Sequence, residues 1–207
     1  MVIWRSYGQT MHGEIKILTD FGDPAVLLPL SLVFFIWLLL TRRLATAIIW
    51  LLIVAACNAV IAVLKVYFLA CPAGAALHSP SGHTCFSILV YGSLTIALAL
   101  AVKRRWMRKA VIVLGTLFIA AIAVSRFVLG NHSPMEIAIG AVIGGVGLAV
   151  FAAVYRRSAN RRGPVLLLAL AAVIVAFIFH GQQVKAEGYL RYLGWELGLH
   201  GEACGFR

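Results

Sequence analysis

Two polar clusters with histidine interrupt an otherwise apolar chain, and the first is a Ser-Pro-Ser-Gly-His segment at residues 79–83. The serine and proline that open it predict the N-cap and first position of a helix, and free N–H groups at such a helix start bind anions. Gly82 lets a ligand approach the backbone closely, and Ser81 adds a hydroxyl donor. His83 is a side chain that can protonate a leaving oxygen near neutral pH. The segment predicts a phosphate site, although a capped helix with an incidental histidine explains it equally well by itself.

The second cluster follows a later apolar run and contains four candidate residues: Ser125, Arg126, His132 and Glu136. An arginine offers a planar fork of donors for phosphate oxygens. Ser133 and Glu136 have the spacing of a capping box, with the serine at the N-cap. Glu136 can also hold His132 in the tautomer that leaves its other nitrogen free to attack phosphorus. The two interpretations of Glu136 are compatible.

Lys65 is the third candidate, in the last turns of the apolar run that precedes the first cluster. A lysine at the bilayer centre costs about 3 kcal/mol on insertion scales, and less near the end of a span. Its side chain either snorkels to the headgroups or points into the bundle as an anion ligand.

Metal binding is the rival role for three histidines of this region: His78, His83 and His132. Their spacing matches no zinc motif, and the chain contains neither His-Glu-x-x-His nor Cys-x-x-Cys. Lys65 and Arg126 would also oppose a second cation beside them. We therefore expect no metal at this site.

The elements that position these clusters are membrane-spanning helices. The chain has 207 residues, of which 62% are hydrophobic and 12% charged, and its mean hydropathy is +0.97. About six apolar runs reach the length of a transmembrane helix. They cover residues 25–40, 44–70, 85–102, 111–129, 135–155 and 164–180. The expected fold is all-α: a polytopic membrane bundle of about six transmembrane helices, with interfacial helices at both ends.

We expect one integral membrane domain over residues 1–207. Its three parts are an interfacial N-terminal segment at 1–24, the transmembrane bundle at 25–180 and an interfacial tail at 181–207. The tail mixes charges with tyrosine and tryptophan, and aromatic side chains of this kind favour the headgroup region.

The net charge of +11 comes largely from three short basic loops, at 41–43, 103–109 and 156–162. Loops rich in Lys and Arg face the cytoplasm. Both termini and both histidine clusters then lie on the outer side. The charge is thereby explained without nucleic acid. We expect a bacterial inner membrane, with the active site and both termini on the periplasmic side.

Together these clusters resemble the type-2 phosphatidic acid phosphatase superfamily, membrane lipid phosphatases related to the vanadium haloperoxidases. The family pattern is Lys-x6-Arg-Pro, then Pro-Ser-Gly-His, then Ser-Arg-x5-His-x3-Asp. The second motif is matched in full at residues 80–83. Ser125, Arg126 and His132 match the third in type and spacing. The resemblance covers about residues 25–155.

The chain departs from this pattern at two places. Lys65 is followed after five residues by Cys71 and Pro72, so the spacing is one short and a cysteine replaces the arginine. The final aspartate of the third motif is Glu136 here. The missing arginine removes one expected phosphate contact, whereas the longer carboxylate can still reach the histidine.

The resemblance implies a metal-independent lipid phosphatase that needs no cofactor and works through a phosphohistidine. In it, His132 would attack phosphorus, His83 would protonate the leaving lipid oxygen, and Glu136 would orient His132. The residues expected to bind the phosphate are Lys65, Ser81, Gly82, Arg126 and Ser125. The candidate substrates are a polyprenyl pyrophosphate such as undecaprenyl pyrophosphate, phosphatidic acid, phosphatidylglycerophosphate and a lipid A phosphate.

Two alternatives stay open. A protein of the same fold could bind or transport a lipid phosphate without hydrolysing it, although retention of both histidines argues against this. A metal or haem membrane protein could use His83 and His132. In the preferred interpretation the partners are a lipid phosphate substrate and membrane lipids, without nucleic acid, and the oligomeric state, a monomer included, stays open. Cys71 and Cys204 are both expected outside, and we hypothesise a disulfide between them, with Cys71–Cys85 as the alternative.

Overall fold

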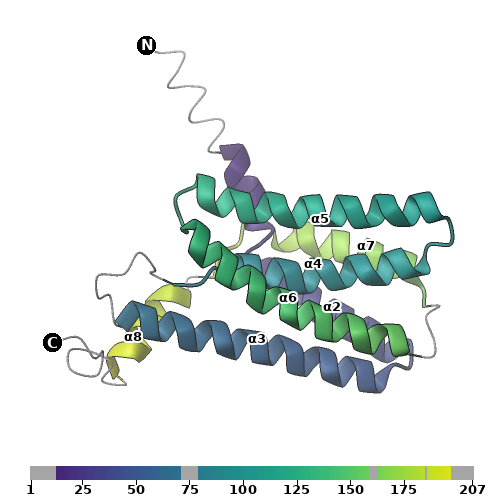
Figure 1. Cartoon of the computed structure of the whole chain (residues 1–207), viewed down its shortest axis with the longest axis horizontal. Helices are drawn as coiled ribbons and strands as arrows, with labels where there is room; N and C mark the ends of the chain where they lie inside the picture. Colours follow the sequence, from purple (N-terminus) through teal and green to yellow (C-terminus); the bar gives the residue numbers. More distant parts are fainter. Residues whose placement is uncertain (1–12, 71–78, 159–162, 185, 197–207) are drawn as a thin grey trace, which may run out of the picture.

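A computed structural model of the chain describes residues 13–70, 79–158, 163–184 and 186–196. Every regular element in this part of the chain is a helix (Figure 1). Residues 13–20 form a first helix. The seven that follow are α2 Pro24–Leu40, α3 Leu44–Ala70, α4 Gly82–Ala101, α5 Arg105–Val128, α6 Pro134–Arg157, α7 Val165–Phe179 and α8 Ala186–Glu196.

Five helical stretches of the described chain are long and apolar enough to cross a membrane: Gly13–Leu40, Leu44–Phe68, Gly82–Ala101, Arg105–Val128 and Pro134–Arg157. The sixth apolar helix, α7, has 15 residues. At 1.5 Å per residue it measures about 22 Å, less than the roughly 30 Å of a hydrocarbon core. The predicted all-helical, polytopic membrane bundle is confirmed, with one span shorter than expected. The protein is an integral membrane protein.

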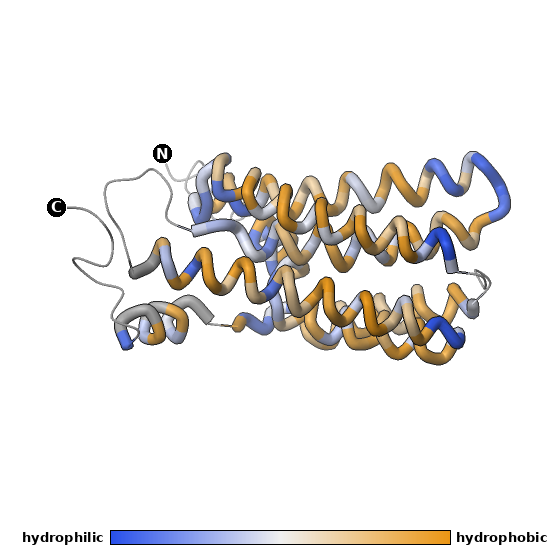
Figure 2. Tube along the Cα trace, turned by 60° about the horizontal axis from the view of Figure 1, so that its bottom comes forward, coloured by the Kyte–Doolittle hydropathy of each residue, from blue (hydrophilic) through white to orange (hydrophobic). Residues whose placement is uncertain are grey.

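The long helices lie side by side, so the loops gather at two ends (Figure 1). The last turns of α2, α4 and α6 lie at one end of the bundle, and each is followed in the sequence by one of the three segments with an excess of Lys and Arg. Figure 2 shows hydrophilic residues at this end and at the opposite end, and apolar residues along the length of the bundle between them. The starts of α4 and α6 lie at the opposite end. Both histidine clusters are therefore at the end away from the basic loops.

Close packing of α4 against α6 brings these two helix starts together. A Cβ atom at Gly140 would overlap with the backbone carbonyl oxygen of Ser81, and one at Gly144 would overlap with that of Cys85. Gly140 and Gly144 are four residues apart and form a small-xxx-small motif on α6. This motif makes a contact between two helices of one chain, of the kind that lets helix backbones approach each other in membranes.

The start of α4 corrects one expectation. Its N-cap is Ser81, whose side chain accepts the N–H of Thr84, and Gly82 is the first helical residue. The helix had been expected to begin at Ser79 and Pro80. Instead the N–H of Ser79 is bound by the Glu136 side chain, and that of Ser81 by the Glu136 carbonyl oxygen at 3.0 Å. These bonds to α6 keep the two residues before Ser81 out of the helix.

The segment before α2 folds over the same end of the bundle. The Tyr91 hydroxyl donates to the carbonyl oxygen of Phe21 at 2.8 Å, and the ring of His180 lies 3.0 Å from the carbonyl oxygen of Ile17. Gln183 donates to Asp20 at 3.2 Å. These contacts fix the polar side chains of residues 16–23 beside the two histidine clusters.

Candidate active site

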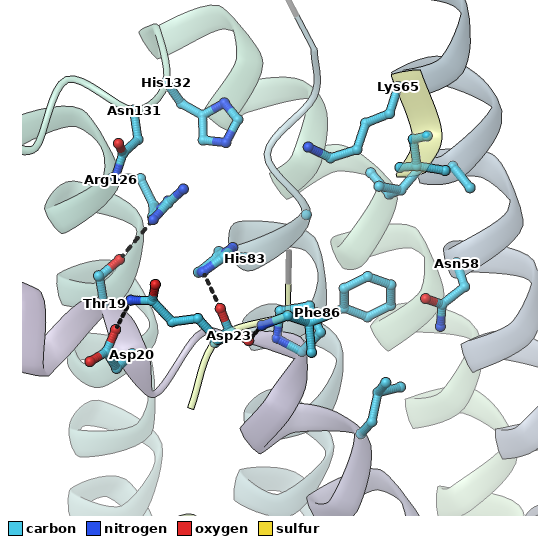
Figure 3. A pocket seen from close by; sticks show the side chains of 18 of the residues that line it. Thr19, Asp20, Asp23, Asn58, Lys65, His83, Phe86, Arg126, Asn131 and His132 are labelled. Carbon is cyan, nitrogen blue, oxygen red and sulfur yellow. Dashed lines mark hydrogen bonds and ion pairs between the residues drawn. The ribbon is translucent and has the colours of Figure 1, made fainter. Parts of the chain in front are cut away.

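A cavity of about 910 Å³ opens at the end of the bundle where α4 and α6 begin. Five of the eight residues expected from the sequence line it: Lys65, Gly82, His83, Arg126 and His132. They come from α3, α4, the end of α5 and the loop before α6. In Figure 3 the side chains of Lys65 and Arg126 reach toward the same space from opposite sides, with both histidines between them. Two cations facing one space can hold a phosphate from two sides.

The carboxylate of Glu136 joins the two motif segments. Its Oε2 atom accepts the Nδ1–H of His132 at 3.0 Å and the backbone N–H of Ser133 at 3.0 Å. Its Oε1 atom accepts the backbone N–H of Ser79 at 3.0 Å. The capping box with Ser133 is formed as well. The capping box is therefore confirmed, and the contact with His132 that the catalytic interpretation requires is present. The carboxylate lies behind His132 rather than in the cavity.

This contact leaves the Nε2 atom of His132 with a lone pair, because the proton of the neutral ring is on Nδ1. Burial lowers the pKa of His132 below its usual value, and the positive charges of Arg126 and Lys65 lower it further. The hydrogen bond to Glu136 acts in the opposite direction. The ring is therefore largely neutral at neutral pH, which is the form that a nucleophile requires.

Replacing Glu136 by glutamine is expected to move the acid limb of the rate profile to lower pH. His132 must be unprotonated to attack, so the wild-type rate should fall only below the ordinary histidine pKa of about 6.5. Glutamine removes the charge that raises the pKa of His132, so the pKa falls further. The measurement is the initial rate against pH for both proteins on one substrate, so that titration of the substrate cancels. An acid limb that moves to higher pH in the variant would contradict this prediction.

Each of the two cations has a hydrogen-bond partner at the cavity wall. Lys65 Nζ donates to the Ser79 hydroxyl at 3.5 Å, and Arg126 Nη1 donates to the Thr19 hydroxyl at 3.3 Å. Lys65 is 9% exposed. It therefore points into the bundle, and the snorkelling alternative is wrong for this residue.

The three other predicted residues do not line the cavity. Ser125 is buried and donates to the carbonyl oxygen of Ile122 at 2.6 Å. The Ser81 hydroxyl is fully buried and meets the hydroxyl of Thr84 at 3.0 Å. Both serines shape the helix ends that carry Arg126 and His83. A direct phosphate contact from either serine requires its side chain to rotate.

Residues from the N-terminal segment complete the cavity, and the sequence had not indicated them. They are Lys16, Thr19, Asp20 and Asp23, together with Gln183 from the segment after α7. Asp23 is the N-cap of α2, and its Oδ2 atom lies 3.6 Å from Nε2 of His83. The available signal was a pair of aspartates just before an apolar helix, in a chain with seven acidic residues.

The cysteine expectations fall mostly outside the described residues. Cys71 and Cys204 are not described, and neither is His78. Cys57 and Cys85 carry free thiols, whereas both hypothesised disulfides include Cys71 and so lie outside the described residues.

The geometry can be compared with known families at this point. A family model described as the PAP2 superfamily matches residues 71–160. This match covers 90 of the 207 residues. The PAP2 match contains both histidine clusters and Glu136, whereas Lys65 and Asp23 precede it. It confirms the resemblance to the type-2 phosphatidic acid phosphatases, and it supports a phosphatase activity at the level of the superfamily. No curated protein and no solved structure matches the chain.

Proposed function

We propose that this PAP2 protein is a metal-independent lipid phosphatase that works through a phosphohistidine at the outer face of a bacterial inner membrane. One arrangement carries the proposal: a buried histidine, fixed by a carboxylate, faces a cavity between two cations at one end of a membrane bundle. His132 and Glu136 are 3.0 Å apart, and Lys65 and Arg126 provide the cations. The basic loops at the opposite end support the outer location, because such loops stay in the cytoplasm.

The reaction has two steps. Nε2 of His132 attacks phosphorus, and the bond from phosphorus to the lipid oxygen breaks while that oxygen takes a proton from His83. Water then attacks the phosphohistidine and gives its proton to the now neutral His83, which restores the acid. The bond from phosphorus to Nε2 breaks, and His132 leaves as the neutral ring with inorganic phosphate as the product. Lys65, Arg126 and the backbone N–H groups at the start of α4 stabilise the charge on the phosphoryl oxygens, which is usually the largest contribution in such transfers.

The substrate class follows from the other wall of the cavity. Beside the charged residues the cavity is lined by Leu28, Ile61, Ala62 and Phe86. A site that is charged on one side and apolar on the other fits an amphiphile whose phosphate reaches the cations while its chain stays in lipid. Phosphatidic acid, phosphatidylglycerophosphate, a polyprenyl pyrophosphate and a lipid A phosphate all meet this description.

The test is phosphate release by purified protein in detergent, from these four lipid phosphates, with a strong chelator present throughout. We expect release from at least one lipid at a rate that the chelator does not change. Loss of release on chelation, restored by a divalent metal, would contradict the metal-independent mechanism. No release from any of the four lipids would contradict the enzyme assignment and favour a binding or transport role.

A further inference from the structure

The carboxylate of Asp23 divides its two oxygens between two tasks. Oδ1 accepts the backbone N–H of Ala25 at 2.9 Å and that of Val184 at 3.1 Å. Oδ2 faces Nε2 of His83 at 3.6 Å. The Asp23 side chain is only 7% exposed. One oxygen therefore holds the start of α2 and the segment after α7, and the other is directed at the histidine.

Helix capping alone does not explain this carboxylate. Asparagine and serine cap a helix about as well as aspartate does. A charge that is buried at the end of a membrane bundle is costly unless it is paired. His83 is the ionisable side chain that the structure places against Oδ2.

His83 also faces positive charge from the other elements around the cavity. Arg126 of α5 and Lys65 of α3 line the same cavity, and His132 faces it from the loop before α6. Two carboxylates besides Asp23 lie nearby: Glu136 is engaged by His132, and Asp20 accepts from Gln183. A protonated His83 would be repelled by the two cations, so it needs an anion on its other side.

We propose, on the basis of the proposed function, that Asp23 is the positioning residue of the general acid. It holds the Nε2 edge of the His83 imidazole, turns the ring toward the leaving oxygen and stabilises the protonated form that donates the proton. The arrangement is the same as that of His132 with Glu136, because each histidine has one carboxylate beside a ring nitrogen. Asp23 lies outside residues 71–160, so the matched family segment does not contain it.

Because the two oxygens of Asp23 have different partners, one substitution can change the contact with His83 and keep the helix cap. Asp23→Asn keeps an oxygen for Ala25 and Val184 and replaces only the oxygen that faces His83 with an amide. Asp20→Asn is the matched control, because it removes a charge from the same cavity wall and keeps the acceptor for Gln183. The melting temperature of both variants shows that the fold is intact.

The experiment compares an alkyl phosphate, whose leaving oxygen needs a proton, with nitrophenyl phosphate, whose leaving group departs without one. In Asp23→Asn we expect kcat on the alkyl ester to fall about 10–100-fold, at nearly unchanged KM, and kcat on the nitrophenyl ester to fall much less. Asp20→Asn should keep the wild-type ratio of the two rates. Equal losses on both esters in Asp23→Asn, or an unchanged alkyl rate, would overturn the inference while leaving the proposed function intact.

A second readout does not depend on turnover. Nitrogen NMR of isotope-labelled histidine reports the protonation and tautomer of the His83 ring. We expect Asp23→Asn to change the signals of His83 and Asp20→Asn to leave them in place. Unchanged His83 signals in Asp23→Asn would overturn the inference, whether or not the wild type hydrolyses any lipid phosphate.

Discussion

Replacing His132 by alanine is expected to abolish phosphate release from every lipid that the wild type accepts. In the proposed mechanism His132 is the nucleophile that forms the bond to phosphorus. Its loss therefore removes the covalent step itself, whereas loss of another residue would remove one of several stabilising contacts. Removal of a covalent nucleophile in other hydrolases costs about 10⁶-fold in kcat. We expect a loss of at least about 10⁴-fold here, because the cations of the cavity remain to support residual hydrolysis by water.

The measurement is kcat together with a trapping experiment. Labelled lipid phosphate is quenched within the first turnover, and the protein is examined for phosphate on histidine. Label should appear on His132 of the wild type and be absent from the variant. For the label, His180→Ala is the control, because this histidine does not line the cavity and label should stay on His132. Its kcat is not compared, because its ring contacts the N-terminal segment at Ile17. Label on His83 in place of His132 would contradict the assignment of the nucleophile.

The sequence was sufficient to predict that the two histidine clusters lie together at one end of the bundle. Helices of membrane length return the chain to alternate ends, so the segments before α4 and α6 have to lie at the same end. The basic loops predicted which end that would be, and the structure places them opposite the cavity. Motif spacing predicted Gly82, His83, Arg126 and His132 as site residues, and the structure places all four along one cavity.

Side-chain direction could not be predicted in the same way. Ser125 belongs to a motif by type and spacing, but its hydroxyl bonds to the carbonyl oxygen three residues earlier in the same helix. Short hydroxyl side chains compete in this manner for nearby backbone groups, and nothing in the spacing decides the outcome. The N-cap of α4 is a similar case, since Ser79 and Ser81 both have a suitable side chain. Their hydrogen bonds to Glu136, far along the chain, decide between them.

Asp23 was missed for a related reason. Its local environment predicts only a helix start, and that start is present. Its contact with His83 depends on the folding of residues 13–23 over the bundle end, which in turn depends on Tyr91 and His180. Such long-range packing leaves no periodic signal in the sequence. The available signal was an aspartate next to an apolar run in a chain with only seven acidic residues.

Replacing His83 by alanine is the prediction with the second largest effect. The proposed role of His83 is to protonate the leaving oxygen, and a general acid contributes about 10²–10⁴-fold. We expect a loss of that size on alkyl and lipid phosphates, and a much smaller loss on nitrophenyl phosphate. His132→Ala should be inactive on both types of ester, because the nucleophile is needed whatever the leaving group is.

Chemical rescue separates the acid role from a phosphate-binding role of His83. The cavity of about 910 Å³ has room for a free imidazole in the space that the side chain leaves. Imidazole in the buffer should therefore raise the rate of His83→Ala on alkyl phosphates. If His83→Ala lost the same factor in kcat on both ester types and imidazole did not restore it, His83 would be a phosphate ligand and not the general acid. The proton of the leaving oxygen would then have to come from water, and Asp23 would have no acid to position.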